Sequence, residues 1–69
     1  MSVWEIKFKG KDFLLVGDKN DGAIATKKQY ENFLPSHAHL YPNGEIRRWN
    51  EKIGDVSDIK FKEVMEVRR

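Results

Sequence analysis

The chain has 69 residues, no cysteine, and a formal net charge of +2 from 13 basic and 11 acidic side chains. This length allows one small domain, residues 1–69, and the lack of cysteine excludes a disulfide framework and any thiolate metal or redox site. No apolar run approaches the roughly 18 residues that a membrane span needs, so we expect a soluble, cytoplasmic protein without membrane contact. A core this small can also gain from pairing with a second copy, so a homodimer is compatible with the sequence.

Three short strands are predicted in the first part of the chain. VWEIKFK (residues 3–9) alternates, with Trp4, Ile6 and Phe8 on one side and charged residues on the other, as in a half-buried strand. Residues 10–12 read as a turn, and FLLV (13–16) as a short, continuously apolar strand. Residues 17–22 (GDKNDG) are dense in turn formers and indicate a loop, and residues 23–26 read as the next strand.

A short helix is predicted to begin at Thr26. Thr26 and Gln29 have the T-x-x-Q spacing of a capping box, in which side chains satisfy the free N–H groups of the first turn. Tyr30, Phe33 and Leu34 follow at the spacing of one apolar helix face. Pro35 is expected to end the helix after about two turns. A single helix this short must pack on the sheet to be stable.

The segment SHAHLYPNGEIRRW (residues 36–49) predicts a hairpin. Residues 41–44 (YPNG) suit a type I turn followed by a bulge, which pairs His39 with Arg47 and His37 with Trp49. One face then holds Ala38, Leu40, Ile46 and Arg48, and the other holds His37, His39, Tyr41, Glu45, Arg47 and Trp49. A two-residue Asn-Gly turn is the competing register. It would divide the apolar residues between the faces and place Pro42 in a strand, so we prefer the longer loop.

The C-terminal segment, residues 57–69, is compatible with strand or helix by periodicity alone. Its residues 58–62 (DIKFK) repeat the pattern of residues 5–9 (EIKFK), which favours a strand, with a bulge expected near Glu63. The predicted fold is therefore α+β: a mostly antiparallel sheet of five to six strands, curling toward a barrel, with one short helix in the order β-β-β-α-β-β-β.

Catalytic and metal-binding patterns find little support. The chain has no Cys nucleophile, no G-x-S-x-G, no H-E-x-x-H and no glycine-rich phosphate loop, so we expect neither an enzyme nor a cofactor. His37 and His39 are predicted on one side of a strand with Glu45 nearby, but Arg47 opposite His39 would repel a cation, which argues against a metal site. Residues 18–22 fail the calcium-loop pattern by one position and lack its closing glutamate.

The predicted hairpin face favours nucleic-acid binding. If the first and last strands share its sheet, cations and rings gather on one outward face: Lys7, Lys9, Lys60, Lys62, Arg47, Trp49, Tyr41, His37 and His39. Cations that follow a phosphate backbone, mixed with rings that stack on unpaired bases, are typical of binders of single-stranded DNA or RNA. Lys27 and Lys28, at the helix start, are candidate phosphate contacts.

Two other interpretations use the same residues. Exposed Trp, Tyr, His and Arg are also enriched in protein interfaces, so an adaptor, inhibitor or subunit that binds a protein partner is the alternative function. Outward lysines on strands also occur simply because they keep sheet edges soluble.

Overall fold

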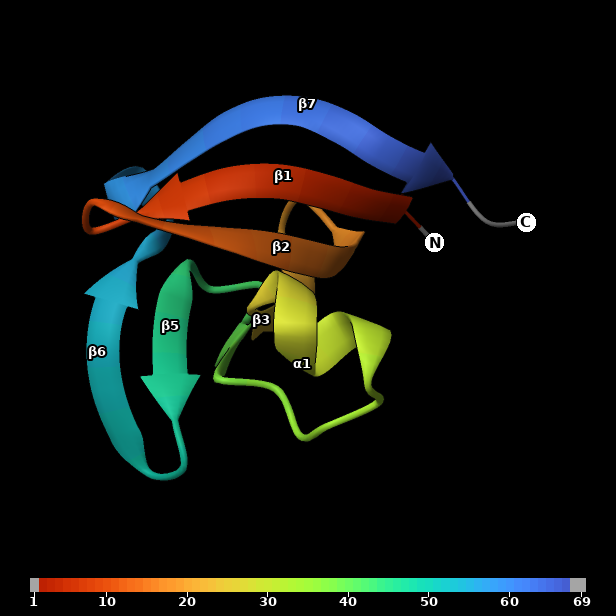
Figure 1. Ribbon diagram of the computed structural model, residues 1–69. Helices are drawn as coiled ribbons and strands as arrows, with labels where there is room; N and C mark the ends of the chain where they lie inside the picture. Colours follow the sequence, from red (N-terminus) through yellow and green to blue (C-terminus); the bar gives the residue numbers. More distant parts are fainter. Residues whose placement is uncertain (1, 68–69) are drawn as a thin grey trace.

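The computed structural model describes the backbone of residues 2–67 and the side chains of residues 2–64. Within this range the chain forms one seven-stranded sheet in the order β6-β5-β4-β3-β2-β1-β7, in which neighbouring strands are antiparallel (Figure 1). The strands are β1 (Ser2–Phe8), β2 (Lys11–Asp18), β3 (Asp21–Ala25), β4 (Ala38–Leu40), β5 (Glu45–Arg48), β6 (Glu51–Asp55) and β7 (Ile59–Val67). A helix, α1 (Lys27–Glu31), joins β3 to β4, and a 3-10 turn, η1 (Val56–Asp58), joins β6 to β7.

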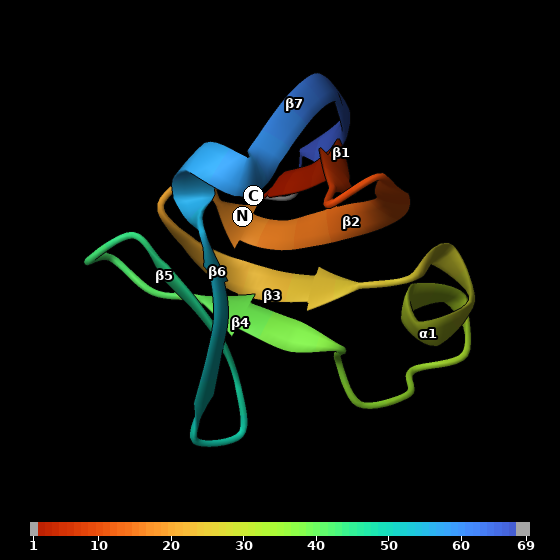
Figure 2. The ribbon, with the colours of Figure 1, turned by 90° about the vertical axis from the view of Figure 1, so that its left-hand side faces the viewer.

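The sheet curls into a half-barrel, so that β5 and β6 run steeply across the direction of β2 (Figure 2). The predicted class, a small antiparallel sheet with one short helix, is confirmed. The predicted five to six strands and their order agree approximately with the structure, which adds β6 as a seventh strand. Residues 51–55 include charged residues and Gly54 and have no alternating apolar pattern that would predict a strand. The two-residue turn that connects β5 to β6, Trp49 and Asn50, also lacks the glycine that usually marks such a turn.

The concave side of the curled sheet holds the hydrophobic core. Leu15, at its centre, lies opposite Trp4 on β1 and Ile24 on β3. The core consists of Ile6, Phe8, Phe13, Leu15, Ile24, Ala38, Leu40, Ile46 and Ile59, with Trp4, Ile53 and Phe61 packed against it. The alternation in residues 3–9 and 38–46 therefore predicted the inward face correctly. Val3, Leu14 and Ala25 are also buried but point to the convex side, where α1 packs on β2 and β3.

Two glycines allow the tight curl. Gly17 has a φ of +136° and lies opposite Gly22 on β3, where a Cβ would stand 2.7 Å from the carbonyl oxygen of Asp21. Gly54 lets β6 approach β1, because a Cβ there would stand 2.9 Å from the ring of Phe8. The ammonium group of Lys9 donates a hydrogen bond to the carbonyl of Ile53 across the same seam. These contacts bring β6 beside the β1–β2 turn although no strand pairing joins them.

The predicted capping box of α1 is confirmed. Gln29 N donates to Thr26 Oγ1 at 3.1 Å, and Thr26 N donates to Gln29 Oε1 at 2.9 Å. The predicted end of the helix is wrong, because α1 stops at Glu31 rather than at Pro35. Leu34 N donates to Gln29 O at 2.9 Å around Phe33, whose φ is +55°. This is a Schellman closure, with phenylalanine at the left-handed position that glycine usually occupies.

The predicted hairpin register is confirmed over its central residues. Gly44 N donates to Tyr41 O at 2.9 Å, Tyr41 N donates to Glu45 O at 2.9 Å, and His39 pairs with Arg47. From Ile59 to Val67 the C-terminal segment is a strand, as predicted, and its pairing with β1 shifts twice. One of these shifts falls between the pairs Glu5–Glu63 and Ile6–Phe61, so the expected bulge near Glu63 is also confirmed.

Candidate nucleic-acid interface

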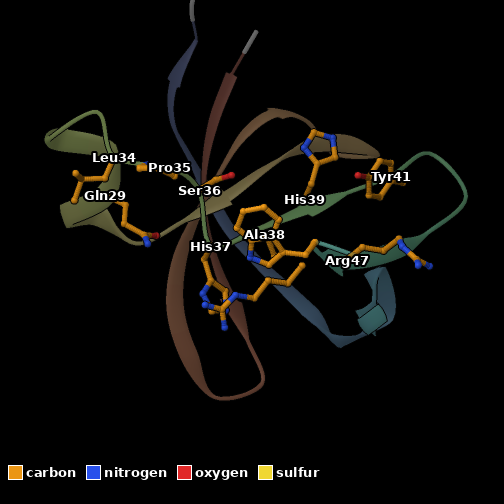
Figure 3. A pocket seen from close by; sticks show the side chains of 11 residues that line it. Gln29, Leu34, Pro35, Ser36, His37, Ala38, His39, Tyr41 and Arg47 are labelled. Atoms are coloured by element: carbon orange, nitrogen blue, oxygen red, sulfur yellow. The ribbon is translucent and has the colours of Figure 1, made fainter. Parts of the chain in front are cut away.

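An open hollow of about 590 Å³ lies where the hairpin of β4 and β5 meets the segment that follows α1 (Figure 3). His39, Tyr41, Arg47, Arg48 and Trp49 contribute its rings and guanidinium groups, and Leu34 contributes apolar surface. We call it the aromatic hollow. The five hairpin residues predicted from the sequence as binding residues all line this hollow: His37, His39, Tyr41, Arg47 and Trp49.

His39 and Tyr41 form the best-defined part of the aromatic hollow. Their ring centroids are 4.7 Å apart with the planes tilted by 53°, and Tyr41 is 41% exposed. Nε2 of His39 lies 3.0 Å from Oδ1 of Asp21, the first residue of β3. This hydrogen bond fixes the imidazole, so the two rings form a surface that is already ordered before a ligand arrives.

Arg47 stabilises the hairpin through two side-chain contacts. Its Nη1 lies 3.2 Å from Oε2 of Glu45, and its Nη2 donates to the carbonyl oxygen of Asn50 at 2.8 Å. The ion pair with Glu45 offsets part of the positive charge of Arg47, and the hydrogen bond to Asn50 links β5 to the β5–β6 turn. Arg47 therefore both lines the hollow and holds the β5–β6 turn in place, so its replacement would disturb the local structure as well as any ligand.

Trp49 does not lie where the sequence predicted. Instead of pairing with His37 in a strand, it occupies the β5–β6 turn with a φ of +59°, and it is 91% exposed. A left-handed conformation is unfavourable for an L residue with a large side chain, costing on the order of 1–3 kcal/mol. The fold thus holds an indole in solvent at a strained position, a combination that is enriched at binding sites.

His37 was also misplaced by the sequence analysis. It precedes β4, and its ring turns away from His39 and stacks on the core residue Phe13, with centroids 5.1 Å apart and planes 24° apart (Figure 3). The strict alternation that predicted one face for both histidines begins only at Ala38. Burial lowers the pKa of His37 below its usual 6.5, and the positive charges of Arg48 and Lys11 lower it further.

We expect the protein to lose stability as the pH falls below about 6.5 because of His37. Since its pKa is lower in the folded state, the unfolded chain binds the proton first, and acid therefore favours unfolding. Urea unfolding followed between pH 8 and pH 5 measures this loss. His37→Gln should flatten the pH dependence in that window, whereas an unchanged profile in the variant would contradict the assignment to His37.

Three of the four lysines predicted to join the rings lie elsewhere. Lys7 and Lys60 are paired on β1 and β7, and Lys62 on β7 holds Oδ1 of Asp12 at 2.8 Å, an ion pair that lowers the pKa of Asp12. Strands β4, β3 and β2 separate β1 from β5, which is about 19 Å of sheet, and α1 packs on β2 and β3 between them. Lys9, in the β1–β2 turn with a φ of +50°, does not line the hollow itself but lines a smaller cavity beside it, together with His37 and Arg48. The single continuous basic face predicted from the sequence therefore does not form.

The two helix lysines do not join the aromatic hollow either. Lys27 lines a small cavity together with Glu5, Asp12 and Lys62, so carboxylates accompany its positive charge. Lys28 is exposed in the first turn of a five-residue helix. Within residues 2–64, no group of three or more potential metal-binding side chains is brought together.

Two features beside the aromatic hollow were not predicted from the sequence. The first is a pair of cations, Lys11 and Arg48, which were not among the predicted binding residues, although the predicted hairpin register placed Arg48 on the inner face.

The second feature is a more apolar groove of about 520 Å³ between α1 and the convex face of the sheet, where Phe33 is 95% and Leu34 52% exposed. The sequence predicted Phe33 on the buried face of a longer helix. Because α1 ends at Glu31, Phe33 lies beyond the helix and is exposed.

Within the described residues, no helix has the length and apolar character needed to cross a membrane. Comparison of the chain with protein-family models, with curated protein sequences and with solved structures finds no match.

Proposed function

We propose that this chain is a non-catalytic domain that binds single-stranded nucleic acid, DNA or RNA, in the aromatic hollow. The observation that carries the proposal is the placement of Tyr41 and Trp49 as exposed rings beside two guanidinium groups in one open depression. Unpaired bases stack on such rings whatever their identity, and arginines contact the neighbouring phosphates.

The footprint on the strand should be short. The lysines of β1 and β7 lie beyond α1, so the electrostatic contribution comes from Arg47 and Arg48 rather than from a broad basic surface. Each phosphate contact lowers the slope of log K against log salt by about 0.7 for a single strand. Two or three such contacts predict a shallow but measurable salt dependence, and two or three stacked bases would supply most of the affinity.

Fluorescence titration tests this proposal directly. Trp4→Phe leaves Trp49 as the single tryptophan of the two in the chain, and it breaks no hydrogen bond within the described residues because Trp4 Nε1 has no partner there. Titration with short single-stranded DNA, single-stranded RNA and duplex DNA should give saturable quenching for single strands that weakens as salt rises. No response to any of the three at low salt would refute the proposal.

A protein-binding module is the second candidate, favoured by Phe33 and Leu34. Both side chains are exposed beside the apolar groove, and Phe33 is held at a positive φ as Trp49 is. Such a surface suits a protein partner or a second copy of the chain, whose contact would depend little on salt. Retention of affinity at high salt therefore distinguishes this candidate from nucleic-acid binding.

A further inference from the structure

A further cavity, of about 280 Å³, opens at the mouth of the half-barrel, between the β1–β2 turn and strands β5 and β6. Phe8 and Phe13 form its apolar floor, and His37 stacks on Phe13 at one wall. Lys9, Lys11 and Arg48 stand around its rim. We call this cavity the basic cleft.

The charge of the basic cleft is less compensated than that of the aromatic hollow. None of the residues that line it is acidic, and among the described residues neither Lys11 nor Arg48 takes part in an ion pair. In the hollow, by contrast, Arg47 is paired with Glu45. The ammonium group of Lys9 gives a hydrogen bond to the carbonyl of Ile53, which holds it at the rim while leaving other protons to donate.

The basic cleft and the aromatic hollow are neighbours, because His37 and Arg48 line both. A strand whose bases stack on Tyr41 and Trp49 would therefore reach the cleft by passing Arg48. The volume of the cleft lies just below the range of about 300–1,000 Å³ that is typical of ligand pockets. It suits one phosphate with its attached sugar better than a strand that continues through it.

We propose that the basic cleft binds the terminal phosphate of a single-stranded nucleic acid whose adjoining bases lie in the aromatic hollow. This inference rests on the proposed function and adds a substrate class to it, a strand that ends in a phosphate monoester. A monoester carries a charge of about −1.5 to −2 at neutral pH, against −1 for an internal diester. Three cations around one rim match the more highly charged group, since hydrogen bonds between charged partners are stronger than those between neutral ones.

The test compares three forms of one short oligonucleotide by fluorescence anisotropy: hydroxyl-ended, 5′-phosphorylated and 3′-phosphorylated. A hydroxyl-ended strand one nucleotide longer controls for the added charge. One phosphorylated form should bind at least about tenfold more tightly than both hydroxyl-ended strands, and the preferred end gives the direction of the strand.

Lys11→Gln should abolish the preference for the phosphorylated end while leaving the affinity for the hydroxyl-ended strand nearly unchanged. Lys19→Gln is the matched control, because it removes the same charge beyond the opposite end of β2, where Lys19 lies 4.5 Å from the ring of Trp4. Equal binding of all forms by the wild type would overturn the terminal-phosphate inference and leave the proposed function intact. A preference that persists in Lys11→Gln would also overturn the inference, and no binding of any strand would refute both.

Discussion

Trp49→Gly is expected to weaken the binding of a single-stranded oligonucleotide by roughly 5- to 150-fold, the effect of losing one stacked base at about 1–3 kcal/mol. The variant should fold as well as the wild type or better. The indole is 91% exposed, so its removal opens no cavity, and glycine adopts a φ of +59° without strain. Anisotropy of a fluorescein-labelled oligonucleotide measures the affinity, and thermal unfolding measures the stability.

Two variants make the Trp49 result interpretable. Trp49→Phe keeps an aromatic ring at the same turn and should retain most of the affinity, because stacking does not depend on the indole N–H. Tyr41→Ala should weaken binding to a similar degree as Trp49→Gly, since Tyr41 presents the second ring. Arg47→Ala is less informative, because Arg47 also holds Glu45 and the carbonyl of Asn50. Wild-type affinity in Trp49→Gly would show that the strand does not stack at this turn.

Leu15→Ala is expected to abolish cooperative unfolding at room temperature. Leu15 is fully buried at the centre of the concave face, and truncating such a leucine typically costs about 2–5 kcal/mol. A domain of this size has a total stability of only a few kcal/mol, so the loss is comparable to the whole. Circular dichroism during a urea titration measures the effect, and the folded baseline should be missing or greatly shortened.

Leu34→Ala provides the matched control for the core, because it is the same substitution at a side chain that is 52% exposed. Its unfolding free energy should lie within about 0.5 kcal/mol of the wild type. If Leu15→Ala unfolded with a wild-type midpoint, the concave face could not be the main core. If Leu34→Ala instead caused the larger loss, the segment after α1 would contribute more to stability than its exposure indicates.

Local patterns in the sequence determined those features that depend on neighbouring residues. The alternation in residues 3–9 set the inward face of β1, the T-x-x-Q spacing set the start of α1, and the YPNG turn set the register that pairs His39 with Arg47. Each rests on steric or hydrogen-bonding preferences within a few residues, so the sequence alone was sufficient.

The tertiary structure alone decided which of these residues meet. Curling of the sheet and the position of α1 separate Lys7 and Lys60 from the hairpin, and β6, which lacks an alternating pattern, closes against the β1–β2 turn through Gly54. That closure brings Lys11 beside Arg48, although 36 residues lie between them in the chain. Curvature and long-range packing arise from the summed fit of many side chains, so no short stretch of sequence encodes them. The aromatic hollow and the basic cleft could therefore be found only in the folded chain.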